Sequence, residues 1–279
     1  MPPRWVTVLI LVGWAATTFQ LVFWEFLPAY SHSVPAPVFI ALADETVGSR
    51  TSVRWSIKRD GIEVMRATSG LDYAEIPSEK FTFWMEYSPL PAASGFLHFR
   101  TLRTEYSTGR NGFLLGIAGK MDVEGPAGFQ IVSQTKMEGK VEGRFLKRKV
   151  EQKLVNTTRS EELSPVEIGR PPMVWFPFMP VWRIGRISPG DSWRVHCIDP
   201  LGDMASSGQG RVSGKILQIE VLKNVDPWKD DPKAILCRRI RATGEECKME
   251  LWVDPDSGKV MKQEVVLEFR HRWTIEREE

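Results

Sequence analysis

The chain of 279 residues has few of the residues on which catalytic and redox sites most often depend. It contains three cysteines and four histidines, and none stands in an H-x-x-H, H-E-x-x-H or C-x-x-C spacing. It also lacks a P-loop, a dinucleotide glycine fingerprint and a G-x-S-x-G nucleophile elbow. We therefore identify no catalytic, cofactor-binding or metal-binding residues from the sequence.

An excess of charge of one sign is also missing. The 37 basic and 35 acidic side chains leave a net charge of +2, so the sequence shows no electrostatic footprint for nucleic acid. Hydrophobic residues make up 42% of the chain and charged residues 26%, which is a globular balance and argues against disorder.

The three cysteines are too few, and odd in number, for a disulfide scaffold. Outside the cytoplasm, one disulfide and one free thiol would be compatible with this number. Cys237 and Cys247 flank a turn signal at residues 242–245, so they could face each other across a hairpin. The alternative is that all three are small buried hydrophobic residues.

One long uncharged run opens the chain. The twenty residues from Trp5 to Trp24 carry no charge and would span about 30 Å as a helix, the thickness of a bilayer core. Tryptophan at both ends suits the two membrane interfaces. A cleaved signal peptide is the rival interpretation, but the only A-x-A site, at residues 41–43, lies far downstream. We therefore favour an uncleaved transmembrane anchor.

The basic residues around this run predict its orientation. Arg4 precedes it, and no further Lys or Arg occurs until Arg50, so the positive-inside rule places the N-terminus in the cytoplasm and the remainder outside. We expect a cytoplasmic N-terminus and anchor at residues 1–27, a proline-containing linker at 28–52, and an extracytoplasmic β domain at 53–279.

After the linker, the hydrophobic residues alternate with a period of two, which indicates half-buried antiparallel strands. The fold class is therefore mainly β, with one curved antiparallel sheet of the half-barrel or barrel-like type. The longest run, 259–275, predicts a single strand with Leu267, Phe269 and Trp273 buried and with Arg270 and Arg272 exposed. The expected strands are 53–58, 62–67, 80–87, 96–103, 113–121, 129–137, 141–150, 192–197, 211–222, 234–241, 247–253 and 259–275.

Three segments carry a resemblance to a known group: Trp55 followed by Asp60-Gly61, the stretch 188–193, and the stretch 250–264. The last contains a Trp-Val-Asp-x-x-Ser-Gly-x-Val turn at residues 252–260. Together they resemble exported bacterial β proteins of the periplasmic lipoprotein-carrier and lipoprotein-sorting type, and related uncharacterised domains. The resemblance implies a half-barrel around an apolar cavity and a periplasmic location, so the anchor predicted above would lie in the inner membrane. The anchor departs from the soluble carriers, because a tethered protein cannot shuttle between membranes.

The least usual stretch is the aromatic segment, residues 171–182, in which every residue is proline or apolar. Its prolines keep it out of helix and central strand, whereas loops are normally polar. It therefore either plugs the open side of the sheet or offers an apolar binding surface. For the second case we expect the ligand-binding residues to be Trp175, Phe176, Phe178 and Trp182.

Three functions follow from these patterns. The first is a membrane-anchored module that binds a lipid, a lipoprotein or another apolar ligand in the half-barrel. The second is an assembly subunit that docks on a membrane-protein partner through the aromatic segment. The third, less favoured, is a cysteine hydrolase, which would need Cys197 to meet a distant histidine and an acid. The sequence indicates no cofactor.

Overall fold

A computed structural model describes most of the region that follows the linker. Gly13, Trp14 and residues 17–20 are helical and exposed, but most of the anchor, the linker up to residue 51, and Trp182 lie outside the described residues. Among the residues that are described, no helix is both long and apolar enough to cross a membrane. The described residues are 13–14, 17–20, 52–74, 80–90, 99–109, 113–124, 131–169, 174–180, 184, 187–205, 213–229, 235–267 and 271–278.

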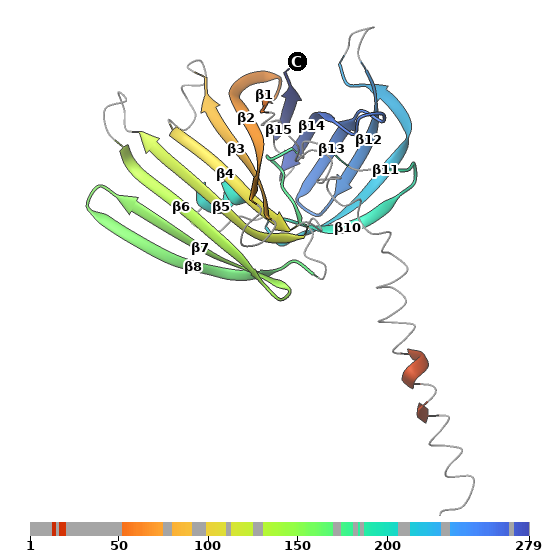
Figure 1. Ribbon diagram of the computed structural model, residues 1–279, viewed down its shortest axis with the longest axis horizontal. Helices are drawn as coiled ribbons and strands as arrows, with labels where there is room; N and C mark the ends of the chain where they lie inside the picture. Colours follow the sequence, from red (N-terminus) through yellow and green to blue (C-terminus); the bar gives the residue numbers. More distant parts are fainter. Residues whose placement is uncertain are drawn as a thin grey trace, which may run out of the picture.

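The described residues form one open sheet of fifteen strands (Figure 1). Its order is β8-β7-β6-β5-β4-β3-β2-β1-β15-β14-β13-β12-β11-β10-β9, and neighbours pair antiparallel except β9 with β10. The strands are β1 (Val53–Arg59), β2 (Ile62–Ala74), β3 (Lys80–Pro89), β4 (Phe99–Gly109), β5 (Leu114–Glu124), β6 (Ile131–Glu142), β7 (Phe145–Leu154), β8 (Thr157–Glu167), β9 (Val174–Trp175), β10 (Ser192–Cys197), β11 (Ile216–Pro227), β12 (Leu236–Thr243), β13 (Cys247–Val253), β14 (Val260–Leu267) and β15 (His271–Arg277). The predicted mainly β, curved antiparallel architecture is therefore confirmed.

The period-two pattern places the apolar residues on one continuous inner face. Ile57 pairs with Ile275 across β1 and β15, and Val265 pairs with both Trp273 and Met249. Directly paired residues lie on the same side of a sheet, so this face continues from strand to strand without changing sides. The alternate residues form the outer, wetter face.

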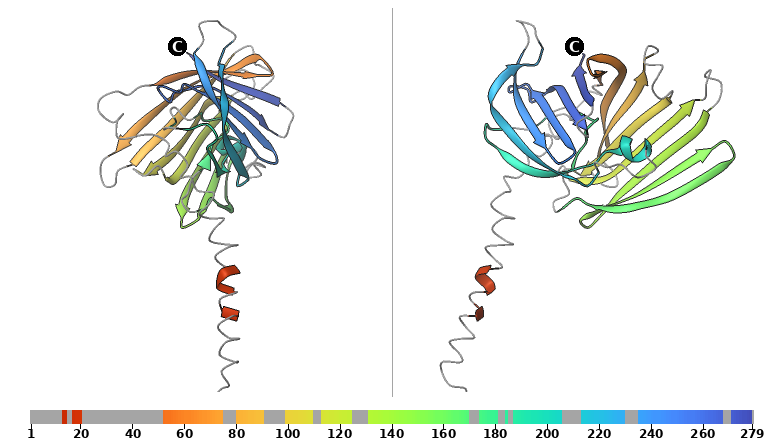
Figure 2. Two further views of the ribbon diagram at one scale, coloured as in Figure 1. Left: turned by 90° about the vertical axis from the view of Figure 1, so that its right-hand side faces the viewer. Right: turned by 180° about the vertical axis from the view of Figure 1, so that it is seen from behind.

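The sheet bends into two curved halves that join where β1 pairs with β15 (Figure 2). The first half, β1–β8, covers a core that includes Trp55, Phe83 and Tyr106. The second half, β10–β15, covers a mainly aliphatic core that includes Leu217 and Ile240. Both cores lie on the inner face.

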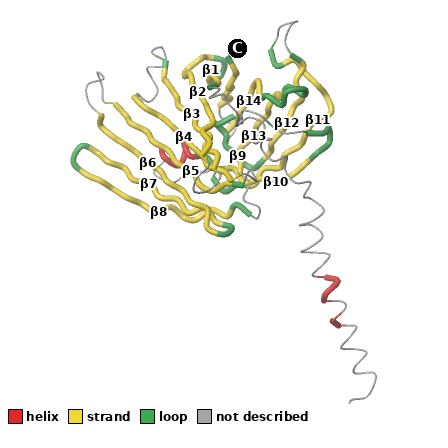
Figure 3. Tube along the Cα trace, viewed as in Figure 1, coloured by secondary structure: helices red, strands yellow, loops and turns green. Residues whose placement is uncertain are grey.

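A short helix packs inside the first half (Figure 3). This helix, α4 (Pro200–Ala205), contacts β5 and β6. Its Met204 lies so close to Gly119 that a Cβ at that glycine would be 2.7 Å from the methionine sulfur. Glycine on β5 therefore makes room for the helix, a role that its place in an alternating pattern does not reveal.

Two predicted strands are each a hairpin. Residues 141–150 turn at Gly143, whose φ of 65° suits glycine. Residues 259–275 turn between Leu267 and His271, which pair with each other. Three residues separate the members of this pair. Odd-numbered residues therefore face the same side before and after the turn, and the sequence alternates as if there were one strand.

The predicted burial of the 259–275 run is correct only in part. Arg272 is exposed as expected, but Leu267 and Trp273 are half-buried rather than buried. Phe269 and Arg270 lie outside the described residues. Sequence patterns also missed β8, a mostly exposed edge strand without apolar alternation.

Candidate functional site

The aromatic segment runs along the join between the two cores. Trp175, only 1% exposed, belongs to the second core, whereas its neighbours Val174 and Phe176 belong to the first. The extended backbone of β9 sends successive side chains to opposite sides, so one strand contributes to both cores.

Aromatic stacking fixes the segment to the first half. The Phe176 ring stacks on Tyr106 at 4.5 Å between centroids, and Tyr106 stacks on Phe83 at 4.7 Å. Phe178, which is half-buried, makes an edge contact with Trp273 at 5.5 Å. These are favourable geometries for aromatic pairs.

Hydrogen bonds from the sheet, and from Ile198 after β10, also satisfy backbone carbonyl groups of this segment. The Tyr87 hydroxyl donates to the Phe178 carbonyl at 3.0 Å, and the Ile198 amide donates to the Trp175 carbonyl at 2.9 Å. The buried Gln263 side chain donates to the Pro177 carbonyl. The void beside Met179 and Pro180 measures about 10 Å³, which is at the lower limit for one water molecule.

The segment therefore makes the contacts that a plug would make. Of the four residues predicted to bind an apolar ligand, Trp175 and Phe176 are buried, Phe178 is half-buried, and Trp182 lies outside the described residues. Ligand binding at these positions stays a prediction.

A polar cluster is buried beneath α4. Arg148 of β7 pairs with Asp203, and Ser213 donates to the same carboxylate at 3.0 Å. Asp199 caps the start of the helix by accepting from the Gly202 amide at 3.1 Å. Burial raises the pKa of Asp199 from its ordinary 3.8 to about 6. Burial also raises the pKa of Asp203, although the Arg148 guanidinium opposes the shift.

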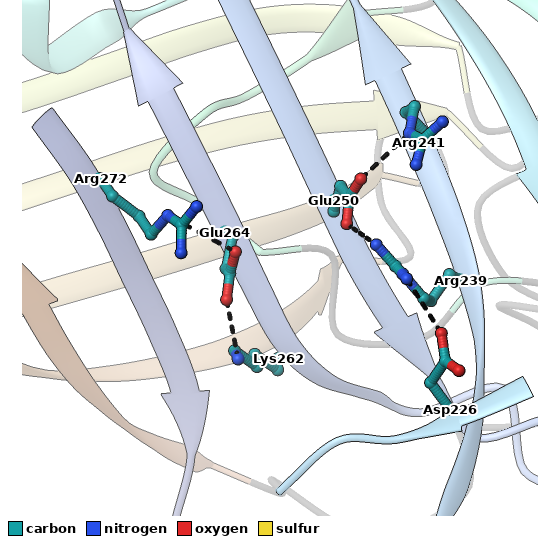
Figure 4. Close-up of polar contacts among 7 residues, drawn as sticks. All are labelled: Asp226, Arg239, Arg241, Glu250, Lys262, Glu264 and Arg272. Atoms are coloured by element: carbon teal, nitrogen blue, oxygen red, sulfur yellow. Dashed lines mark hydrogen bonds and ion pairs between the residues drawn. The ribbon is translucent and has the colours of Figure 1, made fainter. Parts of the chain in front are cut away.

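An open groove of about 630 Å³ lies on the outer face of the second half. Its polar lining comes from strands β11 to β15. Figure 4 shows five of these side chains, Asp226, Arg239, Glu250, Glu264 and Arg272, together with their neighbours Arg241 and Lys262. The outer groove, as we call it, is lined by Asp226, Pro227, Arg239, Lys248, Met249, Glu250, Trp252, Glu264, Val266 and Arg272.

Cross-strand ion pairs organise the outer groove. Glu250 accepts from both Arg239 and Arg241, and Arg239 also donates to Asp226 at 2.9 Å. Burial alone would raise the pKa of Glu250, but Arg239 and Arg241 hold this pKa below its ordinary value. Glu264, directly opposite Glu250, lies 2.8 Å from Lys262 and 4.0 Å from Arg272.

Trp252 forms the apolar wall of this groove. Arg239 and Lys262 lie over its ring at 5.3 and 4.6 Å from the centroid, which is cation–π distance. On the same outer face it packs with Trp228, Cys237 and Met261 in a small separate cluster.

The cysteines do not pair as the hairpin signal suggested. β12 and β13 do form a hairpin, but Arg238 pairs with Val253 at one end and Thr243 with Lys248 at the other. Cys237 and Cys247 therefore lie at opposite ends of it, so a disulfide between them is ruled out. Cys197, the nucleophile considered for the hydrolase alternative, is fully buried. Contact with Cys247 and burial raise the pKa of its thiol well above the ordinary value, which disfavours the thiolate that a hydrolase needs.

Of the groove residues, the sequence analysis placed only Arg272 on the exposed face of a strand. One signal was available: Trp252 lies at a position of its strand where the alternation predicts an exposed side chain. Its partners on the two neighbouring strands, Arg239 and Lys262, are both basic. Their convergence depends on strand register, which alternation alone does not specify.

Comparison with known proteins adds one structural neighbour. A β-barrel-like protein from Brucella abortus, of a domain family of unknown function, is similar with a TM-score of 0.39 and 8% identity over 82% of this chain and 95% of that chain. No family model and no curated protein matches the chain. The lipoprotein-carrier resemblance stays a prediction.

Proposed function

We propose that this protein is a membrane-tethered, extracytoplasmic assembly module whose outer groove binds an acidic segment of a partner protein. The observation that carries the proposal is a contrast between the two faces of the sheet. On the inner face, the described residues of the aromatic segment pack into both cores, whereas the outer face of the second half carries an open groove.

The tether and the location rest on the N-terminal sequence. Twenty uncharged residues, with Arg4 before them and no further basic residue until Arg50, favour an anchor with its C-terminal side outside the cytoplasm.

The choice of an acidic partner rests on the arginines of the groove. The lining itself bears three cations and three carboxylates, and the neighbouring Arg241 and Lys262 pair in register with Glu220 and Glu276. Arginine pairs with carboxylates in a bidentate manner, and the buried Trp252 ring lies beneath Arg239 and Lys262 at cation–π distance. The lining cations are Arg239, Lys248 and Arg272, and the lining carboxylates are Asp226, Glu250 and Glu264.

A lipid in the half-barrel would compete with the aromatic segment for the inner face, because Trp175 and Phe176 are buried in the two cores. Native mass spectrometry of the full chain after gentle extraction separates the two functions. Co-purified lipid that disappears when Trp175 and Phe178 are replaced by serine in a folded protein would favour the ligand-binding function over the assembly module.

The direct test measures binding of a fluorescent oligoglutamate peptide to the detergent-solubilised full chain. We expect saturable binding that weakens with salt. Arg241→Glu with Arg272→Glu should weaken it about tenfold or more, because two rim cations become repulsive.

A matched control is available in the first half. Arg144 and Arg159 are also exposed and also pair with carboxylates, so Arg144→Glu with Arg159→Glu makes the same change of charge away from the groove. Equal losses in both double variants, or no saturable binding to the original protein, would overturn the proposal.

A further inference from the structure

The first half of the sheet ends at the free edge of β8 (Figure 1). β8 pairs with β7 on one side, and none of the described strands pairs with its other side. Of its side chains only Leu163 and Val166 are buried. The backbone groups on the free side of β8 are therefore a template on which another strand can pair.

The strand register shows which residues of β8 present their backbone to the free side. A two-residue turn at 155–156 joins β7 to β8, and Leu154 pairs with Thr157. The pair that closes such a turn is hydrogen-bonded, and bonded and unbonded pairs then alternate along the ladder. Residues 157, 159, 161 and 163 therefore bond to β7, whereas the amides and carbonyls of Thr158, Ser160 and Glu162 point to the free side.

A bulge limits the length of this edge. Arg148 pairs with Leu163 and Leu146 with Val166, so residues 164 and 165 of β8 stand against a single residue of β7. Pro165 also has no amide hydrogen to donate. The part of the edge that can pair regularly is therefore the short stretch 157–163.

Arg159 and Glu161 give this stretch opposite charges at two neighbouring positions of one face. They are two residues apart in the strand, so both side chains point to the same side of the sheet, and they contact each other at 2.9 Å. The residues directly opposite them on β7 are Gln152 and Val150, which carry no charge. The strand on the paired side of β8 therefore supplies neither Arg159 nor Glu161 with a counter-charge.

A second copy of β8 supplies both counter-charges in one register. When two β8 strands pair antiparallel with a two-fold axis at Ser160, each Arg159 lies opposite Glu161 of the other copy, a favourable cross-strand pair. Thr158 then pairs with Glu162 of the other copy, so the free amides and carbonyls make about six hydrogen bonds. Moving the axis by one residue places Arg159 opposite Arg159, or Glu161 opposite Glu161, and like charges in direct opposition are unfavourable.

We propose that the protein is a dimer in which the free edges of two β8 strands pair antiparallel about a two-fold axis at Ser160. The occupant of the edge is a second copy because the charge pattern of residues 157–163 is complementary to itself. Pairing uses the β8 edge of both chains, so this contact closes at two subunits. The outer groove belongs to the other half of the sheet, so each subunit keeps its own groove and the two proposals stand or fail independently.

Disulfide trapping in the detergent-solubilised full chain tests the register. Ser160→Cys places two thiols at the axis, where paired Cα atoms are about 5.5 Å apart and within disulfide range. Thr158→Cys is the matched control, because Thr158 is also exposed on the same face of β8 but would lie about 14 Å from its counterpart. The three native cysteines are buried, so the original protein gives the background. After mild oxidation, a non-reducing gel should show at least about fivefold more cross-linked dimer for Ser160→Cys than for Thr158→Cys.

Charge reversal tests the complementarity. Adding Arg159→Glu to Ser160→Cys should lower the yield of cross-linked dimer about tenfold, because two attractive pairs become repulsive. Adding Glu161→Arg as well exchanges the two charges and should restore the yield. Sedimentation equilibrium of the original protein should show a dimer. A monomeric original protein, equal trapping at positions 158 and 160, or a charge exchange that fails to restore the dimer would overturn the proposal.

Discussion

The two halves of the sheet differ in what their inner faces bury. In the first half, Arg148 and Asp203 are buried as an ion pair on the inner face, with Thr104 and Thr135 also buried. The second half has an inner core made mainly of aliphatic side chains, and its arginines, lysines and glutamates form ladders on the outer face.

This difference has an energetic meaning. A buried charge must be both paired and hydrogen-bonded to offset its loss of water, so the polar cluster of the first half is sensitive to the loss of any member. Exposed ion pairs contribute little to folding. The ladders of the outer groove are therefore better suited to recognition than to stability.

The largest effect should come from the residue that connects the halves. Trp175→Ala removes a buried indole from the second core within a strand whose neighbours pack in the first, and should lower the free energy of unfolding by about 5 kcal/mol. Urea denaturation measures the loss. Trp84→Ala deletes the same ring from a half-buried position beside Arg103, and a comparable loss there would show that the join has no special weight.

The next effect concerns the buried pair of the first half. Asp203→Leu leaves the Arg148 guanidinium buried without its counter-charge and should cost about 4 kcal/mol. Adding Arg148→Met removes the stranded charge, so the double variant should recover at least half of that loss in a denaturation series. Additive losses would show that the two residues do not act as a pair.

A third effect depends on pH and comes from the carboxyl that caps α4. Because its pKa of about 6 lies above the ordinary 3.8, Asp199 favours the folded state below about pH 4. This advantage fades as pH rises through 6, and amounts to about 3 kcal/mol. Asp199→Asn keeps a cap acceptor and never ionises, so relative to the original protein it should gain that amount between pH 4 and pH 8. Parallel stability–pH curves would contradict the assignment.

The smallest effect should come from the outer face of the second half. Arg241→Gln breaks one of the two ion pairs at Glu250 and should change the free energy of unfolding by less than about 1 kcal/mol. A urea midpoint within experimental error of the original protein would agree. A loss as large as that of Asp203→Leu would remove the distinction between the halves.

Alternation predicted the sheet because a strand with one buried face must alternate, as Trp55 and Ile57 do on β1. It failed in two places. The turn between Leu267 and His271 leaves the alternation of the sequence unchanged, so the turn cannot be recognised from it. The edge strand β8 buries Leu163 and Val166, which lie three residues apart and so do not alternate.

The sites were less predictable because they depend on register. The segment containing Trp175 was recognisable from composition alone. The groove around Trp252 brings together residues from strands whose pairing no local pattern encodes. The hairpin signal drew attention to Cys237 as the partner of Cys247, although hairpin register places them at opposite ends.

The pairing of β1 with β15 constrains the order in which the chain can assemble. Lys58 and Glu276 contact each other at 2.5 Å and are 218 residues apart in the sequence, whereas β1 to β8 join through successive hairpins. Those hairpins can form as the chain emerges, but β1 has an unpaired edge until the last strand arrives. Closing so long a loop is slow. During synthesis that edge is a natural place for a chaperone, or a wrong strand, to bind.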